Sequence, residues 1–331
     1  MTADPATFLE PWAPDPSTSA APDPALEPEG YVVLADGDVH LHFLDWGGLA
    51  QPGDPAGGDP AATAHPGVLL LPGLLAPAWT WSPVARRLAR VRRTVVADLR
   101  GQGLSDAPFE GYDLATLAAD AVVVAEGSGL AGVDGTAPIV LAGHGFGAVI
   151  AASAAAVMGD RCAGLILVDG GWERLEVTTG VDVDEFLRGL DEPPEVLRSM
   201  AAYLADRRDF DPESWDADQD RAARDAVVET AAGHVVRAVR PHVVEALVRT
   251  MFAWDPAPVL AAVAAPVTAL VVLGAADADT RLAELRRTAL ARTDVGGTNS
   301  PIRVAGFAGT GHNLMRYRPA EVTAAILAAT G

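Results

Sequence analysis

The sequence predicts an α/β fold in which helices flank a mostly parallel sheet and a helical cap is inserted between two strands. Two observations support this prediction. Short apolar runs, as expected of strands buried on both faces, alternate with helical patterns in residues 68–171 and again in 256–331. Between these stretches, residues 172–255 contain helical patterns and no clear strand.

The individual elements follow from the same patterns. Two apolar runs around Asp36-Gly37, from Tyr31 to Trp46, predict a β-hairpin, and residues 47–66 predict a surface loop. Core strands are expected at 68–71, 94–97, 139–142, 165–168, 267–273 and 302–307, and core helices at 81–90, 114–127, 146–158, 281–292 and 320–329. Cap helices are expected at 183–190, 194–207, 220–237 and 243–252.

Residues 1–29 are rich in Pro, Ala, Asp and Glu. Such a segment buries too little apolar surface to offset the entropy lost on ordering, so a disordered N-terminal arm is expected. The rest of the chain then divides into a core domain, formed by 30–171 and 256–331, and the cap, 172–255.

The composition narrows the functional classes. The chain of 331 residues has a formal net charge of −20, and all 24 of its basic residues are arginines. This negative charge repels nucleic-acid phosphates and anionic lipid, so neither nucleic acid nor a membrane is an expected partner. The single cysteine, Cys162, allows no intrachain disulfide. Since the sequence shows neither a signal-peptide pattern nor a long uncharged apolar stretch, a cytoplasmic protein is expected.

The segment Gly143-His144-Gly145-Phe146-Gly147 joins a predicted strand to a predicted helix. It resembles the nucleophile elbow of the α/β-hydrolase superfamily, in which the nucleophile stands on a sharp turn between two glycines. The resemblance covers about residues 31–330 and implies the α/β-hydrolase fold, in its serine esterase and lactonase branch. It also implies that Gly145, which has no side chain, stands at the nucleophile position.

Two further loops resemble parts of the same family. Leu71-Pro72-Gly73-Leu74-Leu75 follows the first parallel strand, as the family's oxyanion loop does. This likeness implies that the backbone N–H groups of Leu74 and Phe146 form an oxyanion hole. The loop Asp98–Asp106 resembles a family loop that shapes the site, with Gln102 where many relatives have histidine.

The resemblance also suggests a base and an acid. His312 lies between the last strand and the last helix, where the family carries its catalytic histidine, and His144 is the second candidate. Asp277 follows a strongly apolar strand, at the family's place for the acid that orients the histidine. Asp279 and Asp169 remain alternatives for that acid.

Without a side chain at Gly145, an acyl-enzyme cannot form at this position. Three interpretations remain open. In the first, a His312–Asp277 dyad acts as a general base on water or on the substrate. In the second, the protein binds a ligand without catalysis. In the third, it is a serine hydrolase whose nucleophile was replaced at Gly145.

The predicted pocket is lined by Gly73, His144, Trp79, Trp172 and Phe146, together with apolar residues of the cap. This lining favours a small, mostly apolar substrate with a carbonyl group, such as an ester, lactone, thioester or amide. No sequence motif for a metal or a cofactor appears, so neither is expected. A monomer and a homodimer are both compatible with the sequence.

Overall fold

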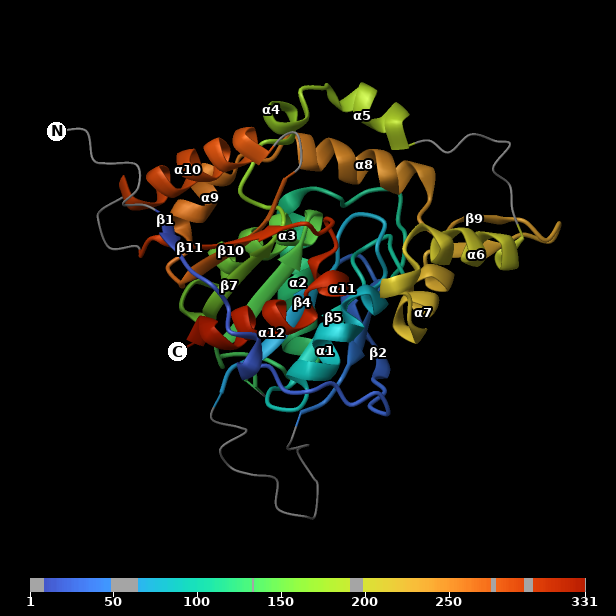
Figure 1. Cartoon of the computed structure of the whole chain (residues 1–331), viewed down its shortest axis with the longest axis horizontal. Coiled ribbons are helices and arrows are strands. Elements are labelled where there is room, and N and C mark those ends of the chain that lie inside the picture. The colour runs from blue at the N-terminus through green and yellow to red at the C-terminus, as the bar shows by residue number, and fades with distance from the viewer. Residues whose placement is uncertain are drawn as a thin grey trace, which may run out of the picture.

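The computed structural model describes residues 9–48, 65–132, 134–190, 199–274, 278–294 and 300–330. Nine strands within these ranges form one sheet (Figure 1). In spatial order they are β1 (Leu9–Pro11), β11 (Ile302–Ala308), β10 (Val267–Leu273), β7 (Cys162–Val168), β6 (Ile139–His144), β4 (Gly67–Leu71), β5 (Thr94–Ala97), β3 (Val39–Asp45) and β2 (Glu29–Ala35).

The pairing between neighbouring strands is parallel from β1 to β5 and antiparallel at β3 and β2. The predicted hairpin therefore forms one edge of a mostly parallel sheet. The central strands β6 and β4 are buried on both faces, which explains why their sequences are apolar without alternation. The predicted fold class is confirmed.

Helices cover both faces of the sheet and pack on two hydrophobic clusters. One face carries α2 (Leu114–Gly127), α3 (Phe146–Met158), α9 (Pro256–Ala262) and α10 (Ala278–Asp294). The other carries α1 (Ser82–Leu88), α11 (Leu314–Tyr317) and α12 (Pro319–Leu327), with the 3-10 helix η4 (Ala78–Trp81). Short 3-10 turns η2 (Pro16–Thr18), η5 (Gly159–Arg161) and η8 (Ala328–Thr330) complete this part of the chain.

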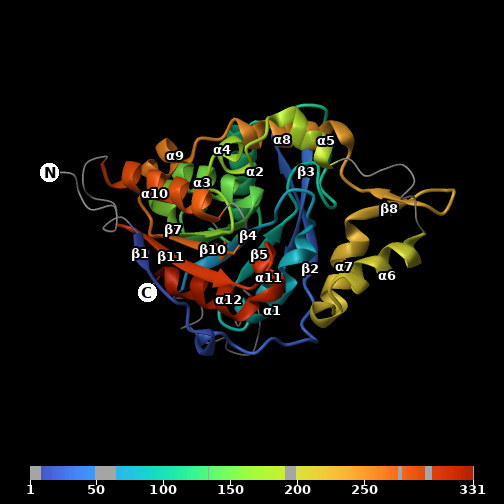
Figure 2. The same cartoon turned by 45° about the horizontal axis from the view of Figure 1, so that its top comes forward.

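We refer to residues 172–255 as the cap segment. In Figures 1 and 2, α5 and α8 lie at the top, and α6 and α7 lie beside the sheet at the right. The described elements of the cap segment are α4 (Leu175–Thr179), α5 (Val183–Leu190), α6 (Met200–Phe210), η7 (Pro212–Ser214), α7 (Ala217–Asp225), β8 (Val227–Glu229), β9 (Val235–Arg237) and α8 (Pro241–Phe252).

The helix predicted over 220–237 is wrong beyond Asp225. There α7 ends, and β8 and β9 form an antiparallel hairpin. The turn between them closes through Gly233, whose φ of +78° suits glycine and whose N–H donates to Thr230 O at 2.9 Å. Each strand contains two consecutive valines, which favour extended backbone. This local preference outweighs the helical spacing of the apolar residues.

The prediction of a disordered arm is wrong for residues 9–29. Strand β1 pairs with the edge strand β11, and Trp12 N–H donates to Val304 O at 2.9 Å. Arginines of α1 then hold the following segment: Arg87 binds Ala20 O at 3.1 Å, and Arg86 binds Glu27 at 2.9 Å. Leu9, Trp12 and Leu26 also pack against the two hydrophobic clusters. Composition missed this order because a few apolar anchors, backbone pairing and charge together hold a segment that is polar on average.

Arg86 also joins the N-terminal segment to the cap segment. Its guanidinium binds Asp218 of α7 at 3.0 Å, and Glu27 reaches Arg221 of the same helix at 2.5 Å. Three parts of the chain that are far apart in sequence therefore meet at one buried arginine.

Within the described residues, no helix is both long enough and apolar enough to cross a lipid bilayer.

Candidate functional site

A cavity of about 1870 Å³ opens at the carboxyl ends of the central parallel strands. Gly73 follows β4, His144 ends β6, Asp169 follows β7 and Leu273 ends β10, and all four line the cavity. The cap segment supplies the opposite wall through residues of α6, α7 and the β8–β9 hairpin. In open α/β sheets, this end of the sheet is where ligands bind.

The turn between β6 and α3 is centred on Gly145, which has φ +53° and ψ −115°. Three neighbouring glycines make this turn sterically feasible. A Cβ on Gly143 would lie 2.1 Å from Gly147 O, and one on Gly147 would lie 2.3 Å from Leu71 O. A Cβ on Gly170 would lie 2.7 Å from the Cα of Gly145. The backbone around Gly145 is therefore packed too closely for side chains at these three positions.

The imidazole of His312 lies directly over Gly145. A Cβ built on Gly145 would be 3.2 Å from His312 Nε2 and 3.6 Å from its Cε1. The His312 side chain is 57% exposed, so this ring faces the open cavity and not the core. The structure thus brings together the two residues on which the sequence-based mechanism depends.

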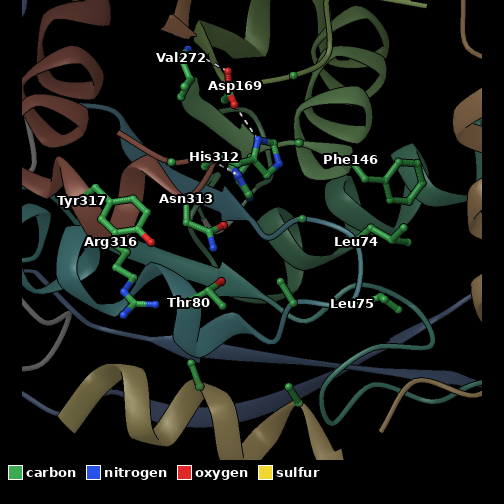
Figure 3. A pocket seen from close by; sticks show the side chains of 18 of the residues that line it. Leu74, Leu75, Thr80, Phe146, Asp169, Val272, His312, Asn313, Arg316 and Tyr317 are labelled. Carbon is green, nitrogen blue, oxygen red and sulfur yellow. Dashed lines mark hydrogen bonds and ion pairs between the residues drawn. The ribbon is translucent and has the colours of Figure 1, made fainter. Parts of the chain in front are cut away.

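Asp169 is the acid that contacts His312, with 2.6 Å between Oδ2 and Nδ1 (Figure 3). Its other oxygen, Oδ1, accepts bonds of 3.0 Å from Val272 N–H and 3.0 Å from Arg281. Asp277, the residue that the sequence favoured, lies outside the described residues. The structure gives this position to an alternative that the sequence analysis had kept open.

The electrostatics of this pair set the tautomer of His312. Burial raises the pKa of Asp169, but the hydrogen bond from His312 and the charge of Arg281 outweigh it, and the pKa falls below its usual value. An ionised carboxylate can only accept, so Nδ1 of His312 carries the proton. In the neutral ring, the lone pair of Nε2 then points over Gly145.

His144 contacts the backbone of the loop that carries His312. Its Nε2 lies 3.1 Å from the carbonyl oxygen of His312, and the two ring centroids are 4.3 Å apart. Burial, followed by the nearby His312, lowers the pKa of His144 to about 3. His144 is therefore neutral, and its Nε2–H donates to the His312 carbonyl.

Leu74 and Phe146, the expected oxyanion-hole residues, both line the cavity. Phe146 is the first residue of α3, so its N–H has no helical carbonyl one turn earlier to bind. Leu74 belongs to the loop after β4. Gln102 holds this loop in place: the Oε1 of Gln102 accepts from Leu75 N–H, and its Nε2 donates to Gly73 O at 3.3 Å. Gln102 is buried, so it supports the loop from the protein interior.

Trp79 and Trp172, expected in the pocket, do not line it. Trp172 is fully buried, with the guanidinium of Arg281 5.5 Å from its ring. Trp79 packs edge-on against Trp46 at 6.1 Å and lies under Arg221 at 4.3 Å. Tryptophan next to a site motif is weak evidence, because a large ring adds core contacts as readily as pocket surface.

Arg281 is the site residue that sequence reasoning missed. It binds Asp169 and, at 2.8 Å, Glu173, so it joins the first turn of α10 to the loop after β7. No sequence signal connects these residues, since more than a hundred positions separate them. Among the described residues, no group of three or more His, Cys, Asp or Glu is arranged to hold a metal ion.

Comparison with known proteins places the chain among hydrolases. A model of the Alpha/beta hydrolase family matches residues 68–326. N-formylmaleamate deformylase of Pseudomonas putida (strain KT2440) is 34% identical over 138 residues, which cover 41% of this chain and 43% of the deformylase. The aligned stretch thus spans less than half of that relative's length.

Solved structures share the fold over nearly the whole chain. E-2-(acetamidomethylene)succinate hydrolase superposes with a TM-score of 0.66 at 20% identity, covering 91% of this chain and 98% of its own. N-formylmaleamic acid deformylase from Pseudomonas putida S16 gives 0.57 at 22% identity, covering 90% of this chain and 100% of its own. At this level of identity the likeness shows the fold alone.

Proposed function

Because this chain belongs to the alpha/beta hydrolase family, we propose that it hydrolyses an amide bond of a small molecule with water as the direct nucleophile. The observation that carries the proposal is the position of His312 Nε2, 3.2 Å from where a Cβ of residue 145 would stand. In this proposal, Gly145 occupies the nucleophile position of the family, and the space left by the absent side chain holds the attacking water.

The proposed reaction has two steps. In the first, His312 Nε2 takes a proton from water while the water oxygen bonds to the amide carbon, and Asp169 stabilises the imidazolium through Nδ1–H. The carbonyl oxygen becomes an oxyanion, for which the N–H groups of Leu74 and Phe146 are the proposed donors. In the second, the C–N bond breaks, and His312 Nε2–H gives its proton to the leaving nitrogen. The products are a carboxylic acid and an amine or amide.

The choice of an amide rests on the names of the relatives. The deformylase and the hydrolase with the similar fold are named for N-formyl and acetamido compounds. Esters, lactones and thioesters are more reactive carbonyl compounds, and the same geometry serves them.

The absence of a covalent nucleophile sets the expected rate. Removing the serine of a serine protease costs about 10⁶-fold in kcat and leaves roughly 10³–10⁴-fold over water from the oxyanion hole and binding. A site built around water recovers part of this loss by holding the water in place. A slow enzyme is therefore expected.

The second candidate is a ligand-binding protein without turnover, and the missing side chain at Gly145 favours it. The third is a serine hydrolase whose nucleophile was replaced. The test is hydrolysis of N-formylmaleamate and short p-nitrophenyl esters by the parent protein, His312→Ala and Gly145→Ser, with mass spectrometry of the intact chain.

Turnover by the parent without an acyl adduct, lost in His312→Ala, supports direct hydrolysis. If only Gly145→Ser reacts and forms an adduct, the replaced serine hydrolase is correct. If no variant reacts while N-formylmaleamate still raises the melting temperature, the chain is a binding protein.

A further inference from the structure

The cavity in front of His312 has two unlike walls. In Figure 3, the side chains of Leu74, Leu75 and Phe146 lie on one side of His312. Arg316 and Tyr317 lie on the other. A substrate whose carbonyl group is bound above Gly145 would therefore meet an apolar surface on one side and, on the other, a polar surface that contains the guanidinium of Arg316. A mostly apolar substrate, as the sequence predicted, leaves the second wall unused.

Arg316 belongs to α11, which begins two residues after His312. Its side chain is 13% exposed and lies between two rings, with the guanidinium carbon 5.8 Å from the Trp215 ring and 5.4 Å from the Tyr317 ring. Nη2 donates to the backbone oxygen of Asp211 at 3.1 Å. The guanidinium is thus held in a fixed position at the cavity wall.

The charge of Arg316 is incompletely neutralised. The closest approach to an acidic oxygen is 3.8 Å, between Nη2 and Asp211 Oδ2, and Nε is buried without a hydrogen-bond partner among the described residues. Two comparably buried arginines are better paired: Arg100 lies 2.6 Å from Asp120, and Arg281 lies 2.8 Å from Glu173. A buried guanidinium without a close carboxylate is costly, and a ligand carboxylate would remove that cost.

We propose that Arg316 binds a carboxylate on the substrate, so that the amide cleaved by this protein is acidic. This inference rests on the proposed function for the identity of the scissile bond, but not for the binding of the anion. Asn313 and Thr80, which also line the cavity and lie near Arg316 in Figure 3, offer an amide and a hydroxyl to the same group. The apolar arm of the substrate lies against Leu74 and Phe146.

The test is calorimetric titration of the full chain with two ligands of matched length, the monoamide glutaramate and the neutral pentanamide. The parent should bind glutaramate at least about tenfold more tightly, as expected for a charged hydrogen bond. Arg316→Gln should reduce this ratio to about twofold, and Arg316→Lys, which keeps the charge but not the planar fork, should retain part of it.

Asp211→Asn should change the affinity for glutaramate in the direction opposite to Arg316→Gln. It removes the carboxylate that competes for Arg316 but keeps the backbone carbonyl that Nη2 binds, so glutaramate should bind about two- to fivefold more tightly. Arg318→Gln is the matched control, since Arg318 lines the same cavity and is already paired with Glu321 at 3.5 Å. This control should leave the glutaramate-to-pentanamide ratio within about twofold of the parent.

Equal affinity of the parent for both ligands would overturn the proposal, as would an unchanged ratio in Arg316→Gln. If Arg316→Gln weakens both ligands equally, Arg316 only fastens the cap segment. Ligand binding requires no turnover, so a protein that prefers glutaramate through Arg316 but cleaves no amide would contradict the proposed reaction alone.

Discussion

Arg281 donates a 3.0 Å hydrogen bond to Oδ1 of Asp169, the carboxylate oxygen opposite the one that contacts His312. Both side chains are buried, with 9% and 2% exposed. Arg281→Gln should lower the free energy of unfolding by about 3–5 kcal/mol, because it leaves the carboxylates of Asp169 and Glu173 buried without their cation. Urea denaturation at pH 7 measures this change.

The matched control for that prediction is Arg249→Gln. Arg249 pairs with Asp184 at 3.1 Å on the surface, where the side chains are 50% and 62% exposed. A surface pair of this kind contributes at most about 1 kcal/mol. Equal losses in the two variants would contradict the structural role given to Arg281.

Asp169→Asn should lower kcat by up to about 10⁴-fold at pH 7, since an amide no longer fixes the tautomer of His312 or stabilises its imidazolium. The measurement is the rate with whichever amide or p-nitrophenyl ester the parent cleaves. Asp277→Asn and Asp279→Asn are the controls. A large loss of kcat in Asp277→Asn together with an active Asp169→Asn would mean that Asp277, the residue that the sequence favoured, is the acid that orients His312.

Gly145→Ser should lose about 1–3 kcal/mol of stability, because a side chain then sits at positive φ and its Cβ meets His312 Nε2. The new hydroxyl should nevertheless react covalently with a fluorophosphonate, detected as an added mass on the intact chain. Gly145→Ala carries the same strain without a nucleophile. Labelling of Gly145→Ala or of the parent would mean that another residue reacts.

Gln102→Leu should reduce kcat by roughly 10- to 100-fold with a smaller change in KM. It releases the Gly73–Leu75 loop, and a displaced oxyanion donor acts mainly on the transition state. Gln102→Glu still accepts from Leu75 N–H but cannot donate to Gly73 O, so an intermediate rate is expected. Full activity in Gln102→Leu would show that the loop holds its shape without this side chain.

The stability of the protein should decrease as the pH falls from 6.5 to 3. Burial lowers the pKa of His144 to about 3 in the native state, whereas the unfolded chain takes up this proton near pH 6.5. The unfolded state therefore binds more protons in this window, and His144 contributes a slope of at most about 1.4 kcal/mol per pH unit. Urea denaturation at several pH values should show a shallower dependence in His144→Gln.

How far the sequence predicts the site depends on the kind of interaction. Apolar runs and glycines mark the strand-to-helix turn at Gly145 and the loop of His312 between the last strand and the last helix, and the resemblance to the family implies what each position does. The choice between Asp169 and Asp277 cannot be made from such patterns, since both residues follow buried strands. It depends on the lateral order of strands: β7 lies next to β6, so Asp169 reaches His312 beside the turn.

The parts that were predicted wrongly depend on contacts between distant segments. Residues 9–29 are ordered because they pair with the edge of β11, bind arginines of α1 and pack Leu9, Trp12 and Leu26 against the core. The hairpin of β8 and β9 replaces a helix through local turn chemistry at Gly233. Charge pairing between residues as far apart in sequence as Glu27 and Arg86 leaves no periodic signal in a single sequence.

The buried guanidinium of Arg86 connects the segment around Glu27 to the surroundings of the cavity. Through Glu27 and Asp218 it fastens the N-terminal segment to α7, and α7 contributes Gln219 and Ala222 to the cavity lining. Removal of the chain up to Pro28 should therefore loosen α7 and change how readily a ligand reaches the cavity, although none of residues 9–28 lines it. Residues 9–28 thus act on the cavity indirectly, by supporting α7.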